Sequence, residues 1–156
     1  MSKSLKRVIA HMQDLGLASE ILHVTVPTNT AQQAADVVGC QLDQIAKSVI
    51  FRGEESGTAI LFLTAGGNRV DAAKASALAG EPLGKADASL IRNQTGFAIG
   101  GVSPFGHLNP IRAFLDPRLL EFEVIWAAAG TPHHMFDIAP DLLVKKTGAQ
   151  VAGFTD

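Results

Sequence analysis

Residues 95–107 read Thr95-Gly96-Phe97-Ala98-Ile99-Gly100-Gly101-Val102-Ser103-Pro104-Phe105-Gly106-His107, and the rest of the chain is organised around them. The apolar run Phe97–Ile99 predicts a buried strand that opens directly into two glycines. Glycine permits a positive φ or a close approach of the backbone, and Pro104 fixes the direction in which the chain leaves. Backbone N–H groups at such a turn are suited to an anion or an oxyanion. The alternative is a plain Gly-Pro turn between two elements.

The composition of the chain limits the classes of protein to which it can belong. The chain has 156 residues, 47% hydrophobic and 18% charged, which predicts one domain, 1–156, with a substantial core. Its net charge of −2 argues against the wrapping of long nucleic acid, double-stranded DNA included, but a pocket for one nucleotide end needs only one or two cations. The single cysteine, Cys40, forms no internal disulfide, which predicts a reducing, cytoplasmic setting. No segment resembles a signal peptide or a membrane span, so we expect no membrane partner.

Periodicity and capping residues predict helices and strands without strict alternation. Thr30-Ala31-Gln32-Gln33 matches a capping box that begins a helix, and Gly39 ends it. We expect helices over 4–15, 31–38, 72–78, 88–94 and 140–147, and one or two helical turns after Asp116-Pro117. We expect strands over 20–26, 45–51, 58–64, 97–99, 111–115, 122–128 and 133–138. Together they predict an α+β fold, a curved, barrel-like mixed sheet flanked by helices.

Lys47 is the most informative single residue, because it interrupts the apolar strand Gln44-Ile45-Ala46-Lys47-Ser48-Val49-Ile50-Phe51. Alternation places Lys47 on the face of Ile45, Val49 and Phe51, which we expect to be buried. A buried ammonium is costly unless it meets an anion or a polarised oxygen. One interpretation is therefore a cation that reaches into a pocket. The other is an edge strand whose lysine extends to water.

Two adjacent histidines, His133 and His134, follow the turn Gly130-Thr131-Pro132. Adjacent residues of a strand point to opposite faces, so at most one of the two histidines lines a given pocket. They are substrate-binding residues, a structural pair, or, with Asp137, part of a metal site. No spacing of His or Cys matches a zinc site, so we expect no metal and no cofactor.

Two further motifs predict no chemistry. Ser103 lacks the strand-turn-helix elbow of a serine nucleophile. Gly66-Gly67 lies before a helix capped by Asp71, but the lysine and hydroxyl of a phosphate-binding loop are missing, so we expect a simple turn.

The combination of motifs resembles the YbaK/ProX aminoacyl-tRNA deacylases, free-standing relatives of the editing domain of bacterial prolyl-tRNA synthetases. The resemblance extends from about Thr30 to the C-terminus. It rests on five motifs in this order: Thr30-x-x-x-Ala34-Ala35, the Lys47 strand, Gly67-Asn68-Arg69-Val70-Asp71, Gly100-Gly101-Val102-Ser103-Pro104-Phe105-Gly106 and Gly130-Thr131-Pro132-His133-His134.

This resemblance implies a curved mixed sheet with helices and hydrolysis of the ester between a wrong amino acid and its tRNA. The substrate would be tRNA(Pro) that carries Ala, Cys or Ser. The partners would be the acceptor end of the aminoacyl-tRNA and, in addition, prolyl-tRNA synthetase. Lys47 matches the essential lysine of the family. Gly100 to Pro104, Ser103 included, match its Gly-x-x-x-Pro loop, which contacts the aminoacyl group. The resemblance adds Thr30 and either His133 or His134 as substrate-binding residues.

The chemistry of the residues agrees with this reading. Ester hydrolysis builds negative charge on the carbonyl oxygen, which the N–H groups of Gly100 and Gly101 can meet, while Lys47 holds the terminal phosphate or the oxyanion. No side chain stands out as a general base, so either a positioned water or a ribose hydroxyl drives hydrolysis. A non-catalytic module that binds tRNA or a synthetase is the alternative function.

Overall fold

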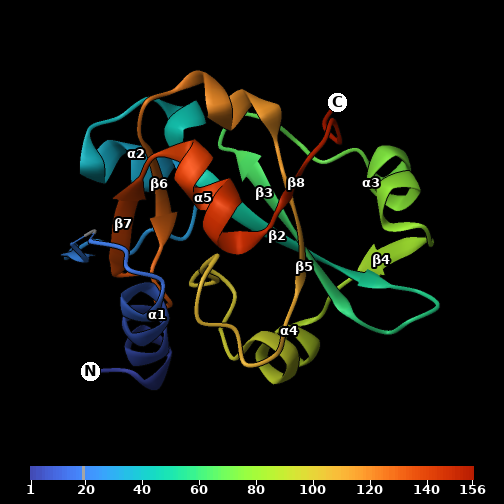
Figure 1. Ribbon diagram of the computed structural model, residues 1–156, viewed down its shortest axis with the longest axis horizontal. Coiled ribbons are helices and arrows are strands. Elements are labelled where there is room, and N and C mark those ends of the chain that lie inside the picture. Colours follow the sequence, from blue (N-terminus) through green and yellow to red (C-terminus); the bar gives the residue numbers. More distant parts are fainter. Residues whose placement is uncertain (19) are drawn as a thin grey trace.

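The strands form two sheets that occupy the two halves of the molecule (Figure 1). The structure, a computed structural model, describes residues 1–18 and 20–156. In spatial order, the five-stranded sheet contains β4 (Leu83–Lys85), β2 (Ala46–Gly53), β3 (Ala59–Ala65), β5 (Arg112–Leu115) and β8 (Gln150–Val151). The three-stranded sheet contains β1 (Leu22–His23), β7 (His134–Ile138) and β6 (Ile125–Ala128).

The pairing confirms the predicted mixed α+β class. β2 runs antiparallel to β3 and β4, whereas β5 runs parallel to β3 and β8. The two sheets meet through an isolated parallel bridge between Ile45 and Trp126. Within the described part of the chain the strands therefore make two joined sheets and close no barrel.

The helices follow the predicted boundaries closely. They are α1 (Lys3–Asp14), α2 (Ala31–Val38), α3 (Ala72–Ala79), α4 (Ala88–Thr95) and α5 (Pro140–Thr147), with two short 3-10 helices, η1 (Leu42–Gln44) and η2 (Pro117–Glu121). The capping box of α2 is present: Thr30 Oγ1 accepts from Gln33 N at 3.1 Å, and Gln33 Oε1 accepts from Thr30 N at 3.2 Å. Gly39 ends α2 with φ +74°, a backbone conformation that favours glycine.

The predicted strand Phe97–Ile99 is wrong, because this segment satisfies its backbone groups locally. Phe97 N donates to Thr95 Oγ1 at 3.1 Å, and Ala98 O accepts from Gly101 N at 3.1 Å. Phe97 is fully buried, whereas the side chain of Ile99 is 63% exposed. Here the three apolar residues that follow α4 form a turn in which only Phe97 is anchored in the core. A run of three apolar residues is too short for its sequence pattern to distinguish such a turn from a strand.

The predicted strand over 20–26 is much shorter than expected. Only Leu22 and His23 are strand residues, and they pair with Met135 and His134 of β7. The edge strands β4 and β8 were not predicted, since three- and two-residue strands carry no readable alternation.

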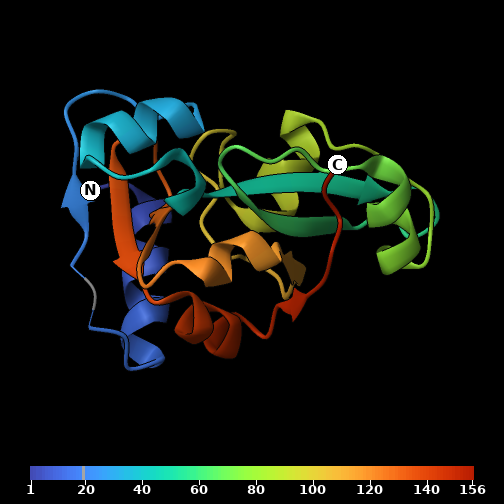
Figure 2. The same cartoon turned by 90° about the horizontal axis from the view of Figure 1, so that it is seen from above.

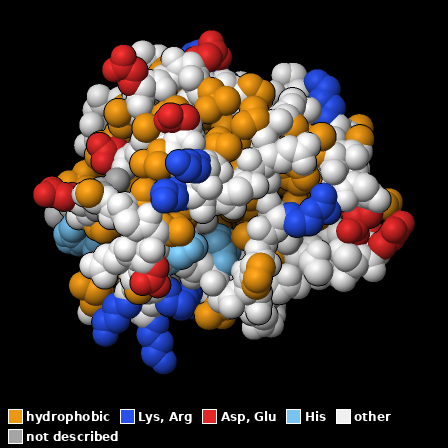
Figure 3. Space-filling model, viewed as in Figure 1, with side chains coloured by type: hydrophobic (Ala, Val, Ile, Leu, Met, Phe, Trp, Pro, Cys, Tyr) orange, Lys and Arg blue, Asp and Glu red, His pale blue; other side chains and the backbone are white. Residues whose placement is uncertain are grey.

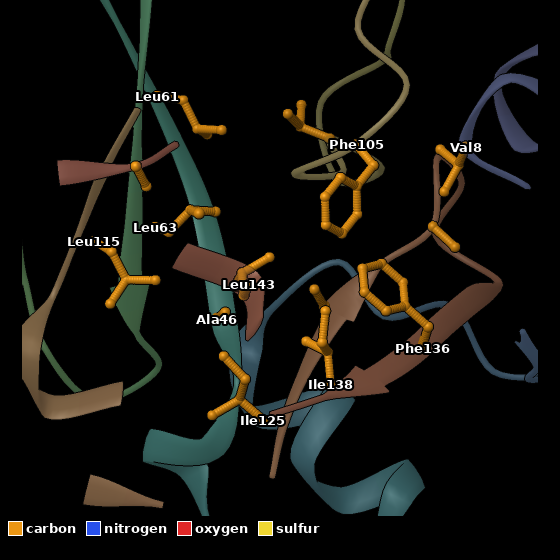
Figure 4. Packing of buried hydrophobic residues seen from close by; sticks show 14 of the residues in the cluster. Val8, Ala46, Leu61, Leu63, Phe105, Leu115, Ile125, Phe136, Ile138 and Leu143 are labelled. Atoms are coloured by element: carbon orange, nitrogen blue, oxygen red, sulfur yellow. The ribbon is translucent and has the colours of Figure 1, made fainter. Parts of the chain in front are cut away.

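Helices cover both faces of the three-stranded sheet (Figure 2). α1 packs on one face through the buried Leu5, Val8 and Met12, and α2 packs on the other through Ala34 and Ala35. Figure 4 shows how the larger core joins the sheets: the side chains of Phe105, Phe136, Ile138, Leu143 and Leu63 converge from both halves of the molecule. The rings of Phe105 and Phe136 lie 5.8 Å apart. β7 therefore anchors the 97–107 loop as well as its own sheet.

We predict that Phe136→Ala destabilises the fold by about 3–5 kcal/mol, because truncation leaves a cavity between α1, β7 and the 97–107 loop. Urea unfolding followed by circular dichroism measures this loss. Val26→Ala, at a side chain that is 53% exposed, serves as control and should change stability by less than about 0.5 kcal/mol. Equal stability of the two variants would contradict this view of the core.

Candidate active site

A cavity of about 290 Å³ opens between α2, the first half of β2, and the turn at residues 98–101. Its polar lining includes the exposed Asn29 and Thr30, and its apolar lining includes the buried Ala34, Ile45 and Met135. The residues that line it are Thr28, Asn29, Thr30, Ala31, Ala34, Ile45, Ala46, Lys47, Ser48, Val49, Ile99, Gly100, Val102, Ala128 and Met135. Lys47, Thr30 and Gly100, predicted from separate parts of the sequence, are thus brought together.

The cavity exists because β2 lacks a strand partner along half of one edge. β3 pairs with β2 over Ala46–Arg52, but β4 pairs with the other edge only over Phe51–Gly53. The three-stranded sheet joins the chain at Ile45, the residue before β2, and among the described residues it makes no bridge to β2 itself. Among the described residues no strand pairs with the intervening edge, so backbone and side chains of residues 46–49 border an open space.

Lys47 is half-buried at this edge, and its ammonium group is held by the main chain. Nζ donates to the carbonyl oxygen of Gly66 at 3.2 Å. The pKa of Lys47 lies below its usual value, mainly because burial removes water from the ammonium and also because Arg69 is nearby; Asp116 and Asp43 oppose this shift. The prediction that Lys47 reaches into a pocket is consistent with this placement.

The Ala98–Gly101 turn forms the opposite rim. Gly100 has φ +91°, and a Cβ there would lie 3.2 Å from Asn29 Oδ1. No acceptor for Gly100 N is recorded in the described part of the chain. Gly101 differs: its N–H donates to Ala98 O, and a Cβ would lie 2.9 Å from Thr131 Cα. Gly100 therefore lines the cavity, while Gly101 lets the turn pack against the 130–134 segment and does not offer its N–H to the cavity.

α1 holds the same loop from behind. Arg7 Nη2 donates to Gly96 O at 2.8 Å, and Arg7 Nε donates to Gly106 O at 3.1 Å. His11 Nδ1 accepts from Gly106 N at 2.8 Å. Arg7 therefore binds the backbone at both ends of the loop.

Ser103 and Pro104 lie behind the turn and do not line the cavity. Both are buried. Ser103 Oγ accepts from Phe105 N at 3.2 Å, and Ser103 O accepts from His107 Nε2 at 2.6 Å. Ser103 and Pro104 therefore shape the loop that presents Gly100. This supporting position differs from the direct contact with substrate that the resemblance implied.

His133 and His134 also lie outside the cavity. His134 follows strand alternation, so Met135 points to the cavity and His134 to the opposite face, where its ring lies 4.9 Å from that of His23. His133 Nδ1 donates to Val24 O at 3.0 Å, and His134 Nδ1 is hydrogen-bonded to Thr131 Oγ1 at 2.6 Å. The pKa of His134 is lowered by burial and then by the two neighbouring histidines. Both side chains brace the 130–134 segment.

The geometry does not assemble the alternative metal site. β7 directs His134 and Asp137 to opposite faces. Within residues 1–18 and 20–156, no group of three or more His, Cys, Asp or Glu side chains is placed to hold a metal ion.

Sequence reasoning missed the apolar wall of the cavity. Ala34 and Met135 approach from α2 and β7, with Ile45 and Ala128 beside them. The small residues Ala31 and Ala34 lie one turn apart on α2, a spacing that could have indicated a close approach. Met135 carried no comparable signal, because its face depends on the pairing of β7 with β6.

Comparisons with known proteins agree with this fold. A model of the aminoacyl-tRNA editing domain family matches residues 25–146. The uncharacterized protein YwhH of Bacillus subtilis (strain 168) is 31% identical over 137 residues, covering 88% of this chain and 87% of YwhH. A crystal structure described as "a putative trans-editing enzyme for prolyl tRNA synthetase" has 43% identity and a TM-score of 0.92, covering 100% of this chain and 99% of that one. A structure from work on epitope backbone grafting onto scaffold proteins has 39% identity and a TM-score of 0.91, with 100% and 99% coverage.

The fold and the cavity thus define an aminoacyl-tRNA editing domain. The chain belongs to the aminoacyl-tRNA editing domain family, as the resemblance of its motifs to the YbaK-like deacylases implied. Over the described residues, no helix has the length and apolarity needed to cross a bilayer.

We predict that His107 makes the fold acid-sensitive. Burial lowers the pKa of His107 to about 4 from 6.5, so below pH 6.5 the unfolded state binds a proton that the folded state does not. The free energy of unfolding should therefore fall by roughly 2 kcal/mol between pH 7 and 4.5 from this group alone. The measurement is urea unfolding at both pH values. The decrease in the free energy of unfolding should be smaller by this amount in His107→Gln, whereas His23→Gln should show the full decrease. An unchanged loss in His107→Gln would contradict it.

Proposed function

We propose that this chain is a cytoplasmic trans-editing hydrolase that cleaves the ester of misacylated tRNA, with tRNA(Pro) carrying Ala, Cys or Ser as substrate. The observation that carries the proposal is the shared cavity of Lys47 and Gly100: a cation and a glycine turn face a hollow with an apolar inner wall. The family membership and the trans-editing relative support the same activity.

Lys47 and Gly100 supply electrostatic stabilisation in this proposal. A water oxygen attacks the ester carbonyl carbon, and the carbonyl oxygen becomes an oxyanion that the Lys47 ammonium and the Gly100 N–H meet. Collapse of this intermediate breaks the bond to the ribose oxygen, which takes up a proton and leaves as a hydroxyl. The proton lost by the attacking water reaches the departing ribose oxygen through solvent, or through the neighbouring ribose hydroxyl, which accepts it and gives up its own proton to the departing oxygen. Thr30, which lines the same cavity, contacts the nucleotide in this proposal.

Selectivity comes from the apolar wall in this proposal. Ala34, Ala128 and Met135 bound the inner end of the cavity, where the amino-acid side chain would lie. A missing or added methylene changes binding by only about 1–3 kcal/mol. The cognate amino acid must therefore be excluded by a steric clash, and Met135 is the largest of these three side chains.

Charge limits how the tRNA is held. The net charge is −2, and in the view of Figure 3 the Lys and Arg side chains are interspersed with Asp and Glu outside a basic group at the lower left. A continuous basic surface would be expected for broad neutralisation of phosphates. We therefore propose that the acceptor end is the main contact, with prolyl-tRNA synthetase as a further partner.

We predict that Lys47→Ala lowers the rate of deacylation at least ~100-fold, because an oxyanion-stabilising group contributes about this much. Release of labelled amino acid from a panel of mischarged tRNAs measures it. Lys74→Ala is the matched control, since Lys74 Nζ also donates to a backbone carbonyl, Thr155 O at 2.8 Å, away from the cavity.

An unchanged rate in Lys47→Ala would remove the mechanism even if activity were present. Binding of tRNA without turnover of any ester in the panel would instead identify a non-catalytic module.

We predict that Met135→Ala raises the ratio of Pro-tRNA(Pro) to Ala-tRNA(Pro) hydrolysis about tenfold or more, because the larger cavity admits the bulkier amino acid. Parallel time courses with the two tRNAs measure this ratio. Met12→Ala removes the same side chain from a buried position on α1 and controls for loss of stability. A ratio that stays constant in Met135→Ala would place the amino-acid subsite elsewhere.

A further inference from the structure

We propose that Asp116 and Asp43 are positioning residues for Lys47, acting through the Ala65–Asn68 turn. This inference rests on the proposed function, since it concerns how the lysine of the same site is held. It follows from a chain of contacts that links the end of β5, η1 and the edge of β2.

The Ala65–Asn68 turn provides the only recorded hydrogen-bond acceptor for Lys47 within the described part of the chain, the carbonyl oxygen of Gly66. Gly66 has no room for a side chain, because a Cβ would overlap the carbonyl oxygen of Leu42. The turn therefore packs directly against the backbone of η1. Its position determines where the ammonium group lies.

Asp116 fixes this turn from inside the protein. Asp116 is only 2% exposed. Its Oδ2 atom accepts from Ala65 N at 3.1 Å and from Asn68 Nδ2 at 2.9 Å. The other oxygen, Oδ1, accepts from Arg118 N at 3.0 Å and caps η2. A buried carboxylate is stable only with such donors, so Asp116 ties both ends of the turn to the end of β5.

Asp43 fixes the turn from the outside. Oδ1 accepts from Gly67 N at 2.8 Å, and Oδ2 pairs with Arg118 Nε at 3.0 Å. The two carboxylates therefore accept from the N–H groups of Ala65 and Gly67, the residues on either side of Gly66, and Arg118 links them.

The same two carboxylates act on the charge of Lys47. Three charged groups influence its ammonium: Arg69 disfavours the cation, whereas Asp116 and Asp43 favour it against partial burial. Loss of either carboxylate should leave the fold intact, but lower the pKa of Lys47 and make the position of its ammonium group less defined. This outcome differs from a general loss of stability, which would change neither the pKa of the folded state nor the pH profile.

The test compares Asp116→Asn and Asp43→Asn with Asp87→Asn. Asp87 caps α4, where its side chain accepts from Leu90 N at 2.8 Å, so its variant makes the same chemical change away from Lys47. The pKa of Lys47 is followed by NMR through its ¹³Cε signal in lysine-labelled protein, assigned with Lys47→Arg. Deacylation is followed in parallel as kcat, KM and their pH dependence.

We expect Asp116→Asn to lower kcat about 10- to 100-fold with KM within about twofold, since a small displacement of an oriented group costs this much. Its Lys47 titration and the alkaline limb of its pH–rate profile should shift to lower pH. Asp43→Asn, at a more exposed residue, should shift both in the same direction by less and covers the case in which Asp116→Asn does not fold. Asp87→Asn should match the wild type.

A Lys47 titration and a pH profile identical to wild type in both variants would overturn the inference. Absence of deacylation by the wild-type protein on every mischarged tRNA would refute the proposed function, while the NMR titration would still decide whether the two carboxylates hold Lys47.

Discussion

The hydrogen bond between the Lys47 ammonium and the Gly66 carbonyl is the interaction on which the site depends. An ammonium group on a strand of the central sheet must find oxygen partners or leave the protein interior. Here the partner is the main-chain carbonyl of Gly66, in the turn that follows β3. This arrangement leaves the remaining N–H groups of Lys47 available to a ligand, while the glycine turn of residue 100 bounds the other side of the same hollow.

The hollow itself is a consequence of topology. Because β4 begins to pair with β2 only at Phe51, and the three-stranded sheet makes no bridge to β2 among the described residues, the edge of β2 between them is open. α1 contributes to the site without touching the cavity. Its Arg7 and His11 hold the loop that presents Gly100, so a helix at the far side of the sheet supports the position of the turn.

Most of the fold could be predicted from the sequence, because caps, glycines and periodicity are local signals. The boundaries of α2 and the positions of β2 and β3 are examples. Lys47, Thr30 and Gly100, predicted as site residues from the sequence, line one cavity, and their roles there stay predictions. Gly101, Ser103 and His134, also predicted as site residues, do not line this cavity. The face of a turn or strand that each of them occupies is decided by long-range pairing, which the sequence does not reveal. Met135 was missed for the same reason.

The most direct test of the central claim is binding of a stable substrate analogue, alanyl-adenosine with an amide in place of the 3′ ester, followed by amide chemical shifts. The account predicts that the shifted signals belong to Lys47, Ser48, Gly100 and Ala34, around one cavity. Shifts confined to the face of His23 and His134, with the cavity residues unchanged, would contradict it.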